Sequence, residues 1–251
     1  MESMEQYRQF LKTNNWRRLQ GIQTDQNRGI AAPAVQKPYA EDAELFDLVG
    51  PGDMTVGRKP LFEVINQRRS RRNFTGDSLT LEELSFLLWV TQGIQKVSGD
   101  ETSVLRTVPS GGARHSFETY LLINRVEGLK PGLYRYLSMD HKLCFLRAGK
   151  NMAEQISGAC CGQKFVGSGA AVFIWTAIPY RMEWRYSIVS HKVIAIDAGH
   201  MCQNLYLAAE SIGAGTCAIG AYFQDQADEF LGVDGREEFV IYIAPVGKIV
   251  L

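Results

Sequence analysis

The chain has 251 residues, 45% of them hydrophobic, and its formal net charge at pH 7 is zero. A chain of this length and composition can bury a sizeable core, which excludes general disorder. Because nucleic-acid-binding domains usually carry a net basic surface, the balanced charge also argues against nucleic acid as a partner.

The N-terminal residues 1–59 predict a short helix followed by an extended arm. Prolines and glycines interrupt residues 21–53, so this arm is expected to lie over another surface, which a partner subunit could supply. Regular structure should resume at Pro60, because proline is tolerated in the first turn of a helix, and the apolar stripe from Leu61 to Ile65 continues that helix. We expect residues 60–251 to form one continuous α+β domain.

A capping pattern and the spacing of apolar residues predict the remaining elements. Thr80 and Glu83 form a T-x-x-E pattern ahead of leucines at helical spacing, which predicts a helix to about Gly93. A longer helix should end at Gly213 and Gly215. Runs of apolar and aromatic residues predict strands, and apolar residues at every third or fourth position predict helices. The predicted strands are residues 120–123, 133–136, 170–176 and 239–245, and the further predicted helices are 152–160, 191–212 and 224–231.

The run from Arg68 to Arg72 places four guanidinium groups and the hydroxyl of Ser70 within five residues. Planar guanidinium groups match phosphate oxygens bidentately and keep their charge at any accessible pH. Since the whole chain has no basic excess, we favour a small phosphorylated ligand over nucleic acid. A solvated run on the surface is the alternative.

Two glycine-containing segments could bring the backbone close to a ligand. Residues 109–113 join a proline to a serine, two glycines and an alanine, although an ordinary loop has the same composition. No Gly-Lys-Ser/Thr follows, which excludes a P-loop. Residues 213–218 match G-x-G-x-x-A, but a helix precedes them and a strand follows, the reverse of the order in a Rossmann fold, so that fold is excluded. Gly220 and Ala221 would leave room for a flat ligand.

Cysteines and histidines give no sign of a metal centre. The five cysteines are odd in number and lack a C-x-x-C pair, and the four histidines lack metal-ligand spacing. Ser168 lies outside any G-x-S-x-G frame, which argues against a hydrolase. Residues 1–16 lack the apolar core of a signal peptide, and no run reaches the roughly 20 apolar residues of a membrane span. We expect a cytoplasmic protein with no membrane partner.

Four segments, taken in this order, resemble the nitroreductase family. They are RRSRRNF from Arg68, TLEELSFLLW from Thr80, residues 106–136 and residues 198–221. More narrowly, the chain looks like the SagB-type dehydrogenase branch, named for flavoenzymes that oxidise azoline rings in modified peptides. The resemblance spans about residues 60–248. It implies a nitroreductase-like fold with a central, mostly antiparallel sheet flanked by helices, a non-covalent FMN, and an intertwined homodimer with both flavin sites at the interface.

The resemblance also assigns residues to the flavin. The opening basic motif and a basic residue near the C-terminus would bind the phosphate and ribityl chain, and the loop at 109–113 would reach the flavin of the partner chain. Backbone amides at 219–221 would lie near N5, and an asparagine common in nitroreductases is replaced by Ala113. The cofactor-binding residues carried over are Arg68, Arg69, Ser70, Arg72, Pro109, Ser110, Gly111, Ala113, Gln163, Ile219, Gly220, Ala221 and Lys248.

The activity that the resemblance implies is hydride transfer through flavin N5, from NAD(P)H to a small conjugated acceptor such as a quinone or nitro compound. Azoline-oxidising members carry a Lys-Tyr pair as acid and base, and Arg185 stands where that lysine would fall. Arginine is a poor proton shuttle because its pKa stays above about 12, so Tyr186 is the candidate catalytic residue, with core or interface packing as the alternative. The other functions considered are an azoline-type dehydrogenase and a non-catalytic flavin-binding or partner-binding subunit of a peptide-modification complex.

Overall fold

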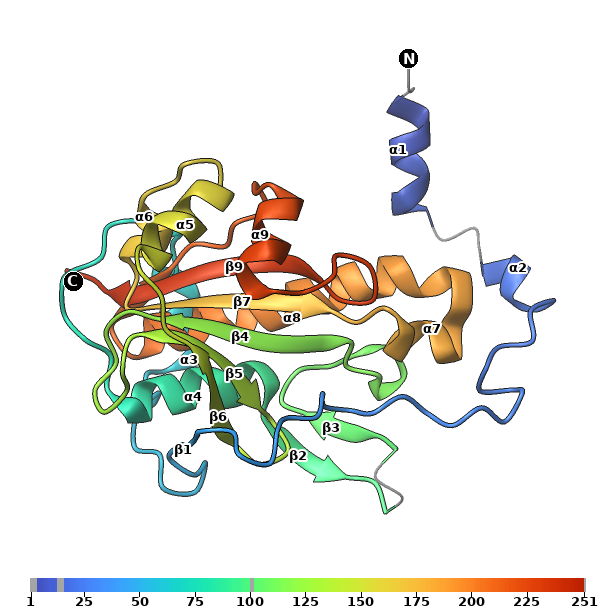
Figure 1. Cartoon of the computed structure of the whole chain (residues 1–251), viewed down its shortest axis with the longest axis horizontal. Helices are drawn as coiled ribbons and strands as arrows, with labels where there is room; N and C mark the ends of the chain where they lie inside the picture. The colour runs from blue at the N-terminus through green and yellow to red at the C-terminus, as the bar shows by residue number, and fades with distance from the viewer. Residues whose placement is uncertain (1–3, 13–15, 100–101, 251) are drawn as a thin grey trace.

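The computed structural model describes residues 4–12, 16–99 and 102–250, and its centre is a seven-stranded sheet (Figure 1). The strands lie in the order β1-β6-β5-β4-β7-β9-β8, and every neighbouring pair is antiparallel. The predicted α+β class with a central, mostly antiparallel sheet is confirmed. The strands are β1 (Leu45–Asp47), β4 (Phe117–Ile123), β5 (Gly132–Leu137), β6 (Lys142–Arg147), β7 (Ala171–Ala177), β8 (Ala214–Thr216) and β9 (Phe239–Lys248), and β2 (Ile94–Val97) and β3 (Val104–Arg106) form a separate hairpin.

Helices cover both faces of the sheet, and α1 projects from the rest of the chain (Figure 1), with its last residue, Leu11, accepting a hydrogen bond from Lys192. Among the residues that the structure describes, no helix is long and apolar enough to cross a membrane. The helices are α1 (Met4–Leu11), α2 (Trp16–Leu19), α3 (Leu61–Gln67), α4 (Leu81–Gln92), α5 (Met152–Ala159), α6 (Phe165–Ser168), α7 (Tyr180–Tyr186), α8 (Ser190–Ser211) and α9 (Gln224–Leu231), with 3-10 turns η1 (Gly111–Ala113) and η2 (Ser187–Val189).

The central strands β4 and β7 are buried along their whole length. Successive side chains of a strand point to opposite faces, so each of these strands feeds two cores. Leu121 and Phe173 pack with α4 and α8, whereas Leu122 and Ile174 pack with α5 and α9. The continuous apolar runs in the sequence therefore mark strands that are covered on both sides.

The helices begin and end close to their predicted positions. The helix after Pro60, α3, ends at Arg68, so the arginine run leaves the end of a helix. The predicted capping box of α4 is present: the Thr80 hydroxyl accepts from the Glu83 amide at 3.1 Å, and the Glu83 carboxylate accepts from the Thr80 amide at 2.9 Å. Gly213, at φ 68°, follows the end of α8 as expected.

Several local features differ from the expectation: β1, the β2–β3 hairpin and α7 were not predicted, and Gly215 and β6 differ as well. Gly215 does not end the long helix; it lies in β8, where a Cβ would come within 2.6 Å of the Arg71 side chain, so the glycine makes room for that arginine. Strand β6 was not predicted, because the turn before it contains no glycine or proline, and His141 adopts φ 51° there instead.

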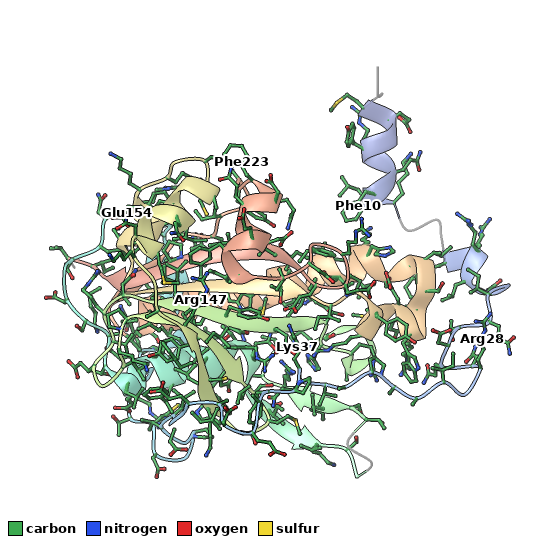
Figure 2. The ribbon with its side chains drawn as sticks, in the orientation of Figure 1. Phe10, Arg28, Lys37, Arg147, Glu154 and Phe223 are labelled. Atoms are coloured by element: carbon green, nitrogen blue, oxygen red, sulfur yellow. The ribbon has the colours of Figure 1, made fainter. Side chains whose placement is uncertain are left out.

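The extended arm lies on its own chain. Strand β1 pairs with β6, and buried arginines bind the backbone before it: Arg106 donates to the Val35 carbonyl at 3.1 Å and Arg135 to the Pro38 carbonyl at 2.7 Å. Lys37, labelled in Figure 2, forms an ion pair with Glu238 of the neighbouring segment. The sheet itself, and not a partner subunit, therefore lies beneath this part of the arm.

Glu118 on β4 connects the arm and α7 to the sheet. Its carboxylate accepts from the Lys37 amide at 2.9 Å and forms an ion pair with Arg181 of α7. The side chains of Glu118 and Arg181 are only 4% and 3% exposed. A buried pair of this kind is costly to break, because the remaining charge has lost both its solvent and its partner.

We expect Glu118→Gln to lower the free energy of unfolding by about 3–5 kcal/mol, since it leaves the Arg181 charge buried without a carboxylate. Urea unfolding of the variant and the original chain measures this loss. The matched control is Asp47→Asn, which breaks the Lys142–Asp47 pair at 3.0 Å, where the Asp47 side chain is 86% exposed. Its cost should stay below about 1 kcal/mol. Equal losses in the two variants would contradict the role given to burial.

Candidate functional site

The arginine run lies between α8 and β8, where Tyr206 links it to the segment after β8. The Ser70 hydroxyl lies 3.1 Å from the Tyr206 hydroxyl, and the Arg68 guanidinium lies 5.4 Å from the centroid of the Tyr206 ring. Tyr206 also accepts from the Ala218 amide at 2.8 Å, and Ser70 forms a bridge to Thr216. One tyrosine thus brings together two predicted segments that are far apart in sequence.

Three arginines of this run keep their charge free of acidic partners. Within the described ranges, no carboxylate oxygen lies within 4.0 Å of the guanidinium nitrogens of Arg68, Arg69 or Arg72. Arg69 donates only to nearby backbone carbonyls, and the Arg72 guanidinium lies 5.8 Å from the centroid of the Phe165 ring. These cations are available to an anionic ligand.

Two neighbouring cations are already neutralised. Arg71 lies 3.7 Å from the carboxylate of buried Glu210, and Lys248 forms an ion pair with Glu83, the residue that also caps α4. The predicted phosphate residue Lys248 therefore has a carboxylate partner inside its own chain. An anion that bound Lys248 would have to compete with Glu83.

The segment after β8 adds open backbone to this group. Gly220 and Ala221 are exposed, and a Cβ built on Gly220 would meet no atom within 4 Å. Gln163 donates to the Ala221 carbonyl at 3.4 Å, which brings a third predicted residue to the same place. Ile219 differs, because it is buried and its amide donates to the Ile243 carbonyl at 2.7 Å. The Ile219 amide is thus already hydrogen-bonded to β9.

The loop from Pro109 to Ala113 lies elsewhere along α8. The Gly111 amide donates to the Asp197 carboxylate at 3.1 Å, and the Ser110 hydroxyl accepts from the His115 amide at 2.9 Å. Burial raises the pKa of Asp197, although the hydrogen bonds from Ser110 and Gly111 act in the opposite direction. The loop is therefore fixed to the helix through its backbone.

Within one chain, this loop and the arginine run do not form one site. The loop meets α8 at Asp197, whereas Ser70 meets α8 at Tyr206, nine residues further on. Nine residues of α-helix span about 14 Å along the axis. The predicted cofactor residues therefore fall into two groups, one around Tyr206 and one around Asp197.

Tyr186 belongs to the group around Asp197. It is the last residue of α7, and a Cβ built on Gly112 would come within 2.5 Å of its hydroxyl oxygen. The Trp16 ring of α2 lies edge-on to the Tyr186 ring, with 6.0 Å between centroids, and the Arg185 guanidinium lies 5.5 Å from that ring. Tyr186 thus lies directly against the predicted proline-serine loop.

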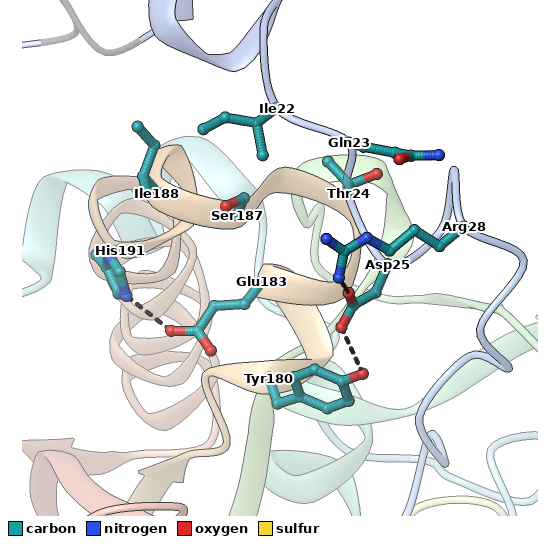
Figure 3. Close-up of a pocket in the computed structure, with 10 residues that line it drawn as sticks. All are labelled: Ile22, Gln23, Thr24, Asp25, Arg28, Tyr180, Glu183, Ser187, Ile188 and His191. Carbon is teal, nitrogen blue, oxygen red and sulfur yellow. Dashed lines mark hydrogen bonds and ion pairs between the residues drawn. The ribbon is translucent and has the colours of Figure 1, made fainter.

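The turn at the start of the arm holds α7 from the outside. Tyr180 donates to the Asp25 carboxylate at 2.9 Å, and Trp184 donates to the Ile30 carbonyl at 2.9 Å. A pocket of about 450 Å³ lies between this turn, α7 and the start of α8 (Figure 3). His191 and Glu183 are paired across it at 2.8 Å (Figure 3). The arm therefore supports the helix that carries Tyr186.

Sequence reasoning missed Tyr206, Gly112 and Trp16. Tyr206 lies within the recognised segment 198–221, but nothing in the sequence around it indicates that its hydroxyl meets Ser70 and Ala218. Trp16 lies in a four-residue helix far from α7 in sequence. Gly112 was part of the recognised loop. The reason that position 112 requires glycine is the nearby Tyr186 side chain, together with the positive φ of 59° at Gly112.

We expect the cost of Gly112→Ala, measured by urea unfolding, to be smaller in a Tyr186→Phe background by about 0.5–3 kcal/mol, the coupling typical of contacting residues. The nearest atom that the new methyl meets is the hydroxyl oxygen, which the Phe variant lacks. Gly128→Ala serves as the control, because Gly128 has φ 79° and nothing within 4 Å of its Cβ position. Its cost should be equal in both backgrounds; equal costs for Gly112→Ala as well would refute the contact.

Comparisons with known proteins now place the chain. A model of the nitroreductase family matches residues 65–248. "Putative nitroreductase MJ1384" of Methanocaldococcus jannaschii is 30% identical over 188 residues, which are 75% of this chain and 90% of that protein. Trifolitoxin-processing protein TfxB of Rhizobium leguminosarum bv. trifolii is 31% identical over 113 residues, 43% of this chain and 30% of that protein.

Solved structures with the same fold include members of this family. A chain titled "putative nitroreductase" from Anabaena variabilis matches with a TM-score of 0.70 and 28% identity over 86% of this chain, which spans only 43% of that longer one. A chain of the E. coli microcin synthetase McbBCD complex, solved with truncated pro-MccB17 bound, matches with a TM-score of 0.61 over 100% of this chain and 99% of that one; at 18% identity this shows the fold alone. The resemblance to the nitroreductase family drawn from the motifs is confirmed. The family model covers the chain from α3 to the end of β9, and the protein is therefore a member of the nitroreductase family.

Proposed function

We propose that the protein is an FMN-dependent oxidoreductase that takes a hydride from NAD(P)H and passes it to a small conjugated acceptor such as a quinone or nitro compound. The observation that carries this proposal is the group around Tyr206. Arg68 and Arg72 have no acidic partner among the described residues, and Tyr206 links the arginine run to Ala218, which precedes the exposed Gly220 and Ala221. Bound FMN would supply the redox chemistry, and the protein supplies orientation and access. Membership of the nitroreductase family supports the same activity.

The residues present fit a flat group that carries a phosphate. Arg68 and Arg72, with Arg69 beside them, would bind the phosphate by charge-assisted hydrogen bonds, and the Ser70 hydroxyl suits the ribityl chain. The Thr216 hydroxyl oxygen and Arg71 Nε are buried and have no hydrogen-bond partner in the described part of the chain, which leaves two polar atoms here for a ligand. Lys248 would contribute less, because Glu83 already compensates its charge.

We further propose a homodimer in which the loop at residues 109–113 completes the flavin site of the partner. The distance along α8 between Asp197 and Tyr206 separates the two groups within one chain, and this separation supports a site completed by a second copy. Exposed apolar side chains on α3 support such an interface, since Leu61 is 63% and Phe62 78% exposed. Ile196 on α8 is 48% exposed as well.

A second candidate is an azoline-type dehydrogenase, or a non-catalytic subunit, in a peptide-modification complex. The similarity to a trifolitoxin-processing protein and to a chain of a microcin synthetase complex favours it. Arg185 in place of the expected lysine weighs against azoline oxidation, because arginine does not give up its proton at ordinary pH. Turnover of NAD(P)H and a quinone by the purified chain alone would argue against the non-catalytic alternative.

The experiment that tests the proposed function is the visible absorption spectrum of the purified protein under anaerobic conditions, before and after addition of NADPH and then NADH. A yellow protein that bleaches with either nucleotide establishes the flavin and the reductive half-reaction. A yellow protein that does not bleach favours the second candidate. A colourless protein that FMN cannot reconstitute refutes the cofactor assignment.

We expect Arg68→Ala combined with Arg72→Ala to weaken FMN binding by roughly 10²–10⁴-fold, because each lost charge-assisted hydrogen bond costs about 1.5–3 kcal/mol. Fluorescence titration of the apoprotein with FMN measures the dissociation constant. The control removes two cations on the exposed surface, Lys150→Ala combined with Arg236→Ala, and should bind FMN as the original chain does. Retained stoichiometric flavin in the first double variant would contradict the assigned phosphate site.

A further inference from the structure

Arg185 is the one charged side chain of α7 without a charged partner in the described structure. Arg181, one turn earlier on the helix, is buried with Glu118, and Glu183 is paired with His191. Arg185 is exposed, and within the described ranges no carboxylate oxygen lies within 4.0 Å of its guanidinium. The Tyr186 ring lies 5.5 Å from this guanidinium.

A second cation, Arg114, lies close enough to Arg185 to feel its charge. The guanidinium of Arg114 is stacked 4.8 Å from the centroid of the Trp184 ring and donates only to backbone carbonyls. Burial and then the charge of Arg185 lower the pKa of Arg114. Burial, together with Arg106 and other nearby arginines, lowers the pKa of His115 to about 3, so this histidine stays neutral.

The acidic groups in this region are already engaged. Glu118 is held by Arg181, Glu183 by His191, and Asp197 by the Gly111 amide. A ligand that entered beside Tyr186 would therefore meet an uncompensated guanidinium. Two aromatic side chains, Tyr186 and Trp16, lie at the same place and offer contact to a flat ring.

We propose that Arg185 is a specificity-determining residue that binds a carboxylate of the acceptor, so that the enzyme prefers conjugated acceptors bearing an anionic group. The inference rests on the proposed function and adds the chemical class of the substrate. A guanidinium group binds a carboxylate bidentately, which would orient the acceptor ring against Tyr186. This role also gives the arginine a purpose that proton transfer cannot.

The test compares two acceptors with the same nitro-substituted ring, 4-nitrobenzoate and 4-nitrobenzyl alcohol, in the flavin-loaded protein. Arg185→Gln should lower the ratio of their kcat/KM values, benzoate over alcohol, by about 10–100-fold, through a higher KM for the benzoate; this is the loss of one charged hydrogen-bonded contact. Arg185→Lys should keep part of the preference. The two nitro groups differ in reduction potential, so the comparison is between variants and not between acceptors.

The control is Arg28→Gln, which removes a guanidinium of the arm, where it lies 3.6 Å from Asp25. Its ratio should equal that of the original chain. An unchanged ratio in Arg185→Gln, or an equal fall in Arg28→Gln, overturns the proposal. Turnover of the neutral alcohol by the original chain shows separately whether the proposed function holds.

A binding measurement keeps the proposal testable if neither acceptor is reduced. Benzoate and benzamide are similar in shape, and only the first is charged. Isothermal titration calorimetry should give a dissociation constant for benzoate that is at least tenfold higher in Arg185→Gln than in the original chain. The dissociation constant for benzamide should not change comparably. Equal benzoate affinity in the two proteins overturns the inference whatever the activity assays show.

Discussion

The contacts of the buried Glu118 carboxylate are the interactions on which the placement of the arm and α7 against the sheet depends. Glu118 lies on β4, in the middle of the sheet, and binds both the arm through the Lys37 amide and α7 through Arg181. Burial excludes the water that would otherwise stabilise these charges, so they are held to one another. The position of Tyr186 at the end of α7 follows from this contact, although Tyr186 itself does not touch Glu118.

Helix α8 organises the two groups of candidate residues. It packs against the sheet along its apolar face and meets the loop at Asp197 and the arginine run at Tyr206. A single helix therefore fixes how far apart the arginine run and the loop at residues 109–113 lie in each chain.

The fold and the arginine run could be predicted from the sequence, whereas most of the contacts around them could not. Capping residues, apolar runs and the basic motif act locally, so α4, β4, β7 and the end of α3 could be predicted from neighbouring residues. Strand β6 was not predicted, because the turn before it contains no glycine or proline. The pairing of Lys248 with Glu83 joins residues at opposite ends of the domain, and no periodicity signals it. Contacts of this kind depend on the tertiary fold alone.

Glu83 makes two interactions, and an anion that bound Lys248 would link them. The Glu83 carboxylate accepts from the Thr80 amide at the start of α4 and also neutralises Lys248 at the end of β9. An anion that draws Lys248 away changes the charge that the first turn of α4 feels, and the favourable interaction of a free carboxylate with a helix N-terminus then grows. Binding of an anion at Lys248 would thereby be thermodynamically coupled to the stability of α4 through one side chain.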